Sequence, residues 1–299
     1  MQRHCLMRRG GWLVGIALAA CSVAYGQQPP GLDLEGIARA MGTKGEVIGE
    51  TYKVSFPRSD LQVMVGKVRI KPALALSNWA AFKKAGDAAM TYGDLVLLDD
   101  ELNPVISTLE ERGIELAALH NHLLHEHPRV LYIHFIGRGN EVAMAQGLRA
   151  ALALTKTPMA STPARPATKP PVAAQIEQII GYTGTMGGGV FHITVPRNDI
   201  HVHMMGTEIP GYMGMNTPLN FQFEGQKAAI NGDFMLRAAE VNPVIKALRT
   251  HGIEVASLHN HMLDEEPRLF FMHFWAYDDA VTLAKGLKAA LDQMSTGGH

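Results

Sequence analysis

Cysteine is almost absent from this chain. Of 299 residues only Cys5 and Cys21 are cysteines, and both lie close to the N-terminus. This excludes a small disulfide-stapled fold, and it excludes zinc or iron–sulfur sites built from thiolates. The Gly-x-Ser-x-Gly motif of serine hydrolases is also absent. Any metal chemistry must therefore use histidine, methionine or carboxylates, and the chain has 14 His and 16 Met.

The sequence also lacks an excess of charge of either sign. It has 27 Lys+Arg and 28 Asp+Glu. Residues 1–26 contain three arginines and no acid, so the remainder has 24 basic and 28 acidic residues, a net charge of -4. A nucleic-acid partner needs a basic face to neutralise phosphates. We therefore expect a small-molecule or envelope ligand and no nucleic acid.

The N-terminal segment has the layout of a bacterial export signal. Residues 1–10 are basic, and 11–20 form an uncharged apolar run that is too short to span a bilayer. Leu18-Ala19-Ala20-Cys21 matches a lipobox, which would make Cys21 the lipid-modified first residue. Ala24-Tyr25-Gly26 is a rival site for soluble secretion. We predict a signal peptide over 1–26 and an exported protein, either periplasmic or held at the membrane by an N-terminal lipid anchor.

An internal repeat is the strongest feature of the sequence. A shift of 139 residues aligns the chain with itself, and 19 of the 33 positions from Asn103 to Phe135 are then identical. Between the copies, 154–171 is rich in proline, which is typical of an extended linker. We therefore predict a first repeat domain over 32–153 and a second over 172–294.

Each repeat has the pattern of a mixed α/β (α+β) fold. Period-two strands follow a short helix, and Asn103-Pro104 resembles a capped helix start. The apolar run from Ile114 to His120 is typical of a strand buried on both faces. A strand, a helix and this strand would form a βαβ crossover, so we predict a mixed sheet with packed helices and some parallel pairing.

Both repeats place the pattern His-x-His-x3-Glu at the end of this buried strand. The residues are His120, His122 and Glu126 in the first copy, and His259, His261 and Glu265 in the second. Residues two apart on a strand face the same side, so each pair of imidazoles should project together. We predict that the four histidines bind a divalent transition metal, zinc first. The two glutamates would complete the ligand set or act as a catalytic base.

Other interpretations of these residues remain open. The histidines could satisfy backbone groups at a strand end, with Glu126 paired to Arg129, or they could bind an organic ligand. Arg129 and its counterpart Arg268 suit an anionic ligand as well as an ion pair. A cupin fold shares the histidine spacing but is all-β, which disagrees with the helices predicted here.

Two further sets of residues are candidates for binding. His134 and His273 occur in both copies and could act as ligand-binding residues. An extended hairpin would place His134 about 16 Å from position 122, which favours a core role unless the other copy docks there. In the second copy alone, His201, His203, Met205, Met213 and Met215 suggest copper, although methionine on a strand usually packs in the core.

The stretches GDLVLLDDELNPVI, GIELAALHNHLLHEHPRVLYIHF and GIEVASLHNHMLDEEPRLFFMHFWA resemble the LppY/LpqO family of bacterial exported lipoproteins. The resemblance covers both copies. It implies an exported protein that is often lipid-anchored, and it supplies no reaction because the family has no known function. We therefore expect an envelope protein with a His/His/Glu site in each repeat, either a metal-dependent hydrolase or a non-catalytic module for an anionic or glycan ligand. The sequence leaves the oligomeric state undetermined.

Overall fold

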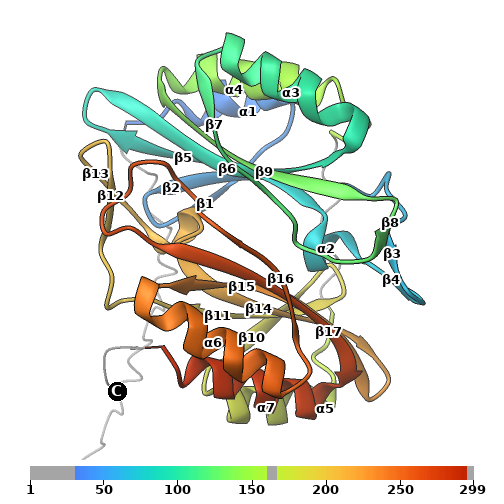
Figure 1. The fold of residues 1–299 in the computed structure, drawn as a ribbon. Coiled ribbons are helices and arrows are strands. Elements are labelled where there is room, and N and C mark those ends of the chain that lie inside the picture. Colours follow the sequence, from blue (N-terminus) through green and yellow to red (C-terminus); the bar gives the residue numbers. More distant parts are fainter. Residues whose placement is uncertain (1–30, 160–166, 295–299) are drawn as a thin grey trace, which may run out of the picture.

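The computed structural model describes residues 31–159 and 167–294. The predicted signal peptide, its Cys21 and residues 160–166 of the predicted linker lie outside the described residues. In the described part of the chain no helix is long and apolar enough to cross a membrane. The two sequence repeats fold in the same way, each as a six-stranded sheet with helices on one face (Figure 1).

The first repeat contains α1 (Leu34–Met41), β1 (Glu46–Ile48), β2 (Thr51–Pro57), β3 (Met64–Val65), β4 (Val68–Arg69), α2 (Pro72–Ala75), β5 (Ser77–Ala85), β6 (Ala88–Leu98), α3 (Asp99–Glu111), β7 (Ile114–His120), β8 (Glu126–His127), β9 (Val130–Gly139) and α4 (Glu141–Leu152). The second contains α5 (Pro171–Ile180), β10 (Gly184–Gly187), β11 (Val190–Pro196), β12 (Val202–Met204), β13 (Thr207–Ile209), the 3-10 helix η1 (Gly211–Met213), β14 (Asn216–Glu224), β15 (Lys227–Leu236), α6 (Ala238–Thr250), β16 (Glu254–His259), β17 (Phe270–Asp279) and α7 (Ala280–Leu291). The predicted α+β class with two tandem domains is confirmed.

The strand order corrects the predicted pairing. The sheets run β1-β2-β5-β6-β9-β7 and β10-β11-β14-β15-β17-β16, and every strand pair within them is antiparallel. The strand–helix–strand connection from β6 through α3 to β7 is present. The predicted parallel pairing is absent because β9 folds back beside β7 and inserts between the two strands. A strand reached by a loop too short for a crossover pairs antiparallel with its predecessor.

The helix after β6 begins earlier than predicted. It starts at Asp99, and Pro104 lies inside it. The Glu101 carboxylate accepts a hydrogen bond from the Leu98 amide at 2.9 Å, which satisfies one of the free N–H groups at the helix start. Acidic residues in the first turn also interact favourably with the helix dipole. The predicted start at Asn103 was therefore wrong by about one turn.

A buried ion-pair network fixes this helix start to the strand beside it. The Arg58 guanidinium is fully buried and donates to Glu101 at 2.8 Å, to Asp60 at 2.9 Å and to the Val96 carbonyl. The second repeat has the same network at Arg197, Asp199 and Glu240. The identity of these positions in both repeats is therefore explained by structure rather than by a ligand.

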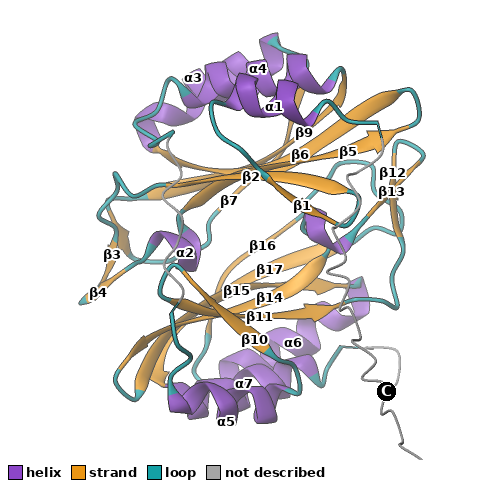
Figure 2. Ribbon diagram, turned by 180° about the vertical axis from the view of Figure 1, so that it is seen from behind, coloured by secondary structure: helices purple, strands orange, loops and turns teal. Residues whose placement is uncertain are grey.

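The two sheets face each other, and the long helices α1, α3 and α4 on one side and α5, α6 and α7 on the other lie outside them, so the molecule has four layers, helix–sheet–sheet–helix (Figures 1 and 2). The short helices α2 and η1 lie between the sheets. Each repeat has its own apolar core between sheet and helices. Two more cores lie between the sheets and combine residues of both repeats, such as Tyr92 with Phe271 and Tyr132 with Trp275. The repeats therefore form one body, and the space between the sheets belongs to both.

Candidate metal centre

Six histidines lie together between the two sheets, three from each repeat. They are His120, His122 and His134 from the first repeat, and His259, His261 and His273 from the second. All four predicted ligands and both additional histidines are therefore in one cluster. The prediction placed one site in each repeat, whereas the structure brings the two sets into a single place. The sequence alone does not indicate how one repeat packs against the other.

The period-two pattern of the strands decides which side chains reach this space. In β9, Ile133 and Phe135 belong to the core beneath the helices, while Tyr132 and His134 point to the opposite face. On β7, His120 pairs with Tyr132 in the strand register, and His134 pairs with Ala118. His134 is thus only one step along the ladder from His120. His134 also meets the second repeat, because its ring lies 4.2 Å from that of His261 and 5.5 Å from that of His259, which is the docking of the other copy under which a site role was expected.

Local twofold symmetry relates the two sets of histidines. His120 and His259 are equivalent in the repeats, and their rings stack with centroids 3.9 Å apart. The distance from His120 to His273 is 5.3 Å, and its symmetry counterpart, from His134 to His259, is 5.5 Å. The contacts across the repeats therefore occur in matched pairs, and the centre lies on the axis between them.

Two buried aspartates accompany the histidines. Asp94 on β6 lies 3.2 Å from His122 Nε2, and the equivalent Asp233 on β15 lies 2.9 Å from His261 Nε2. Each aspartate is paired in the strand register with the histidine of the neighbouring strand, His134 or His273. Sequence reasoning missed both aspartates. The available signal was the Gly-Asp pair kept in both copies inside an otherwise apolar strand.

Burial keeps the imidazoles neutral. It lowers the pKa of His122 to about 3, and burial together with the neighbouring imidazoles lowers the pKa of His120 and His259 well below the usual value. Neutral imidazole has a free nitrogen lone pair, which is the form that binds metals. Burial also raises the pKa of Asp94 to about 7, and the nearby His134 and Lys53 partly offset this effect, so a bound cation would favour the charged carboxylate further.

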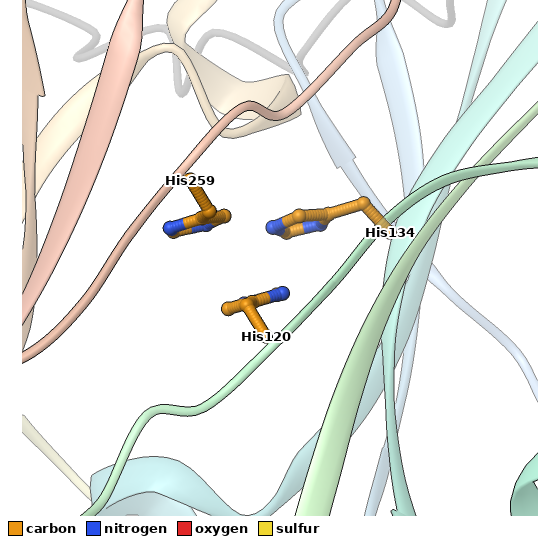
Figure 3. Close-up of side chains that lie close together, drawn as sticks. All are labelled: His120, His134 and His259. Carbon is orange, nitrogen blue, oxygen red and sulfur yellow. The ribbon is translucent and has the colours of Figure 1, made fainter.

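Three groups in the cluster have ligand atoms within 4.8 Å of one another, as a bound metal ion requires. They are His120, His134 and His259; His120, His122 and His273; and Asp233, His259 and His261. The first two groups combine residues of both repeats, and the third belongs to the second repeat alone. Figure 3 shows the first group, in which the three side chains reach toward one another from separate strands.

Several polar atoms of the cluster are buried without a hydrogen-bond partner in the described structure. They include His120 Nδ1, His134 Nε2, both ring nitrogens of His259, His273 Nε2, and Oδ1 of Asp94 and Asp233. A buried polar group without a partner costs about 1–3 kcal/mol. So many in one place indicate a site built for a bound species, because apolar packing would have been more stable.

The two predicted glutamates lie apart from these groups. Glu126 is in β8, a short strand that pairs with β3 of a small three-stranded sheet. Glu265 accepts from Arg268 Nη1 at 3.1 Å and from the Leu269 amide. Neither belongs to any of the three metal-capable groups. The loop after each histidine pair turns away from the centre, and the aspartates of the adjacent strands supply the carboxylates instead.

The two predicted arginines also lie outside the cluster. Arg129 is exposed. Arg268 bonds to Glu265 and to the Leu263 carbonyl, and half of its side chain is exposed. The copper candidates of the second repeat are dispersed as well, because Met213 and Met215 are buried in the core between the sheets while His201 pairs with Glu208 at the surface.

A cavity of about 290 Å³ opens onto the centre. His122, His134, His261 and His273 and both aspartates line it, together with Lys53 and Trp79 of the first repeat and asparagines of the second. Tyr92 lies beside it, and its hydroxyl is 3.0 Å from His134 Nδ1. A small molecule can therefore reach the imidazoles and carboxylates from outside.

Fold and site together define a two-repeat α+β protein with a shared His/Asp cluster that could hold a metal ion. The chain belongs to the family described as Domain of Unknown Function (DUF1259), whose model matches it twice, over residues 35–154 and 174–293. No curated protein matches the chain.

Similar solved structures include the trimeric bacterial microcompartment shell protein PduB, at 11% identity over 84% of this chain and 89% of that one, with a TM-score of 0.21. EtuB from Clostridium kluyveri is 10% identical over 83% of this chain and 88% of its own, with a TM-score of 0.19. Crystal form I of TP0453 is 11% identical over 88% of this chain and 99% of its own, also with a TM-score of 0.19. The site must therefore be interpreted from its own geometry.

Proposed function

We propose that this protein binds a divalent transition metal, zinc first, at one centre shared by the two repeats. The observation that carries the proposal is the convergence of six neutral imidazoles and two carboxylates in a buried cluster. Two carboxylates balance the charge of one divalent ion. Imidazole and carboxylate are the ligands that zinc, iron, manganese and copper share.

The spacing of the donor atoms supports this proposal. Ligands bound at 2.0–2.1 Å to one tetrahedral or octahedral ion lie about 2.9–3.4 Å apart. His120 Nε2 and His122 Nε2 are 3.0 Å apart, and Asp94 Oδ2 is 3.2 Å from His122 Nε2. On the other side of the axis, Asp233 Oδ2 and His261 Nε2 are 2.9 Å apart. Histidines of this cluster and one of the two aspartates would hold the ion.

The cavity supports a further step, metal-dependent hydrolysis. A bound metal would supply a water of lowered pKa and polarise a substrate oxygen. Of this chain's residues, an aspartate left outside the ligand set would accept the proton, and the apolar shell of Tyr132 and Phe271, stacked on His122 and His261, would exclude bulk water. The competing role, a non-catalytic binding module, uses the same cavity but needs no turnover.

We also propose that the protein works outside the cytoplasm. The support is the basic N-terminus followed by the apolar run over 11–20, with Cys21 at a lipobox. The resemblance to the LppY/LpqO lipoproteins points the same way. An envelope location fits a centre without thiolates, because cysteine ligands would be oxidised there.

Elemental analysis of protein purified without a histidine tag tests the metal centre. We expect a stoichiometric transition metal, and uptake of zinc by calorimetry after chelation. The variant His122→Asn with His261→Asn should lose that metal while keeping the fold, since asparagine retains part of the polar volume. Metal-free wild-type protein that takes up no zinc, copper, iron or manganese would refute the proposal. Release of p-nitrophenol from phosphate or acetate esters by zinc-loaded wild type, and its absence in the metal-free protein, tests hydrolysis separately.

A further inference from the structure

The cavity beside the proposed metal centre lies on the axis that relates the two repeats. Its lining contains equivalent residues of both copies, such as Ser77 with Asn216 and Asp94 with Asp233. A symmetric cavity would recognise both ends of a ligand alike. Two of the differences between the halves, however, change the chemistry of the wall.

The first difference is a cation. Among the described residues, Lys53 on β2 is the one lysine or arginine that lines the cavity. Its ammonium lies 4.0 Å from the centroid of the Trp79 ring, and it makes no ion pair or hydrogen bond with the residues that the structure describes. Asp94 and Glu46 are the carboxylates near enough to act on this ammonium, and neither forms an ion pair with it, so the group is positioned to receive an anion. The equivalent residue of the second repeat, His192, is occupied with Asn220 and the Gly187 carbonyl.

The second difference is an aromatic wall. Trp79 stands edge-on to Tyr92, at 5.6 Å between ring centroids, and so holds the lysine over its face. The second repeat has Pro218 at the equivalent position, which also lines the cavity. The first repeat therefore supplies a cation held over a ring, and the second supplies a neutral wall.

We infer that the cavity binds a small oxyanion, a carboxylate or phosphate group of a small organic molecule, between the Lys53 ammonium and the metal. This inference rests on the proposed metal centre and adds the class of ligand. The lysine and the metal give two positive groups in one cavity, whose carboxylates Asp94 and Asp233 are taken up by the ion or its neighbouring imidazoles. A volume of about 290 Å³ is at the lower end for ligand sites, which suits a small molecule rather than a polymer.

Titration calorimetry on the full chain tests the inference with acetate, oxalate and inorganic phosphate as probes. We expect zinc-loaded wild type to bind an anion and the metal-free protein to bind it at least tenfold more weakly. Lys53→Met should weaken anion binding at least tenfold, and Lys53→Arg should retain it. Lys84→Met is the matched control, because Lys84 bonds only to the exposed Asp87 carbonyl. Comparison of the affinities for acetate and oxalate with the affinity for phosphate decides which oxyanion is preferred.

Metal content, measured on the same samples, separates the two hypotheses. Protein that takes up no metal refutes the proposed centre and the inference with it. If metal-loaded wild type binds none of the three anions, the inference is refuted and the proposed metal centre stands. The same holds if metal-loaded Lys53→Met binds the anions as tightly as wild type does. A thermal melt of each variant establishes that it is folded.

Discussion

The imidazoles of His120 and His259, which occupy equivalent positions in the two repeats, stack with their ring planes 8° from parallel. Because the axis between the repeats passes through this pair, a metal bound here would be shared rather than duplicated. Of the three metal-capable groups among the described residues, two combine residues of both repeats. Duplication has thus given the chain one centre with two halves.

A shared centre predicts how single substitutions affect metal content. His122→Ala or His261→Ala should each lower the zinc affinity of the whole molecule by about tenfold or more, because ligands of one ion act together. Two independent sites would instead leave half of the metal at unchanged affinity in each variant. Calorimetry and elemental analysis distinguish these outcomes. His251→Ala is the control, since His251 is exposed and bonds only to the Ala247 carbonyl.

The aspartates should contribute to metal affinity and oppose the stability of the metal-free protein. Burial raises the pKa of Asp94 to about 7 and raises that of Asp233 well above its usual value, so each carboxylate is unfavourable without a cation. We expect Asp94→Asn or Asp233→Asn to lower zinc affinity at least about tenfold while the metal-free melting temperature stays equal or rises. A variant that melts lower without metal and binds zinc normally would contradict the assigned role.

The metal-free protein should lose stability in mild acid. The pKa of each of the six clustered histidines is lowered from 6.5, so below that pH the unfolded chain binds protons that the folded chain does not. The contribution of these histidines to stability is therefore complete above pH 6.5 and falls as the pH decreases. The raised pKa values of Asp94 and Asp233 act in the opposite direction, but they are two groups against six.

Urea denaturation of chelator-treated protein between pH 4 and 7 measures this slope. His122→Asn with His261→Asn should make the slope shallower, because two of the groups that resist protonation are gone. Asp94→Asn with Asp233→Asn should make it steeper by removing the opposing groups. A free energy of unfolding that does not change over this range in wild type would contradict the buried, neutral state of the cluster.

The buried arginine network should dominate the stability of each repeat. Arg58→Met leaves Glu101 and Asp60 without their cation in the interior, and we expect a loss of about 3–5 kcal/mol in the free energy of unfolding. Arg197→Met should behave alike in the second repeat. Arg39→Met is the control, because its pair with Glu35 is exposed and should be worth less than about 1 kcal/mol. Equal effects of Arg58→Met and Arg39→Met would show that the network contributes little.

Much of the molecule follows from the sequence alone. The 139-residue repeat establishes two alike domains, and the alternating pattern of β9 separates Ile133 and Phe135 from His134. The spacing of His120 and His122 places both imidazoles on one side of the chain. These features depend on local geometry. A two-residue period or an internal repeat in the sequence is enough to predict them.

Tertiary structure alone decided the rest. Nothing local indicates that β9 inserts between β6 and β7, which is what sets Asp94 beside His134. Nor does the sequence of one repeat reveal that its sheet packs against the other repeat, which joins two predicted sites into one centre. For the same reason, the carboxylates beside the histidines are those of Asp94 and Asp233 and not the predicted Glu126 and Glu265. Strand order and docking are set by the total apolar surface buried, a sum over residues far apart in the chain, and no short motif contains that sum.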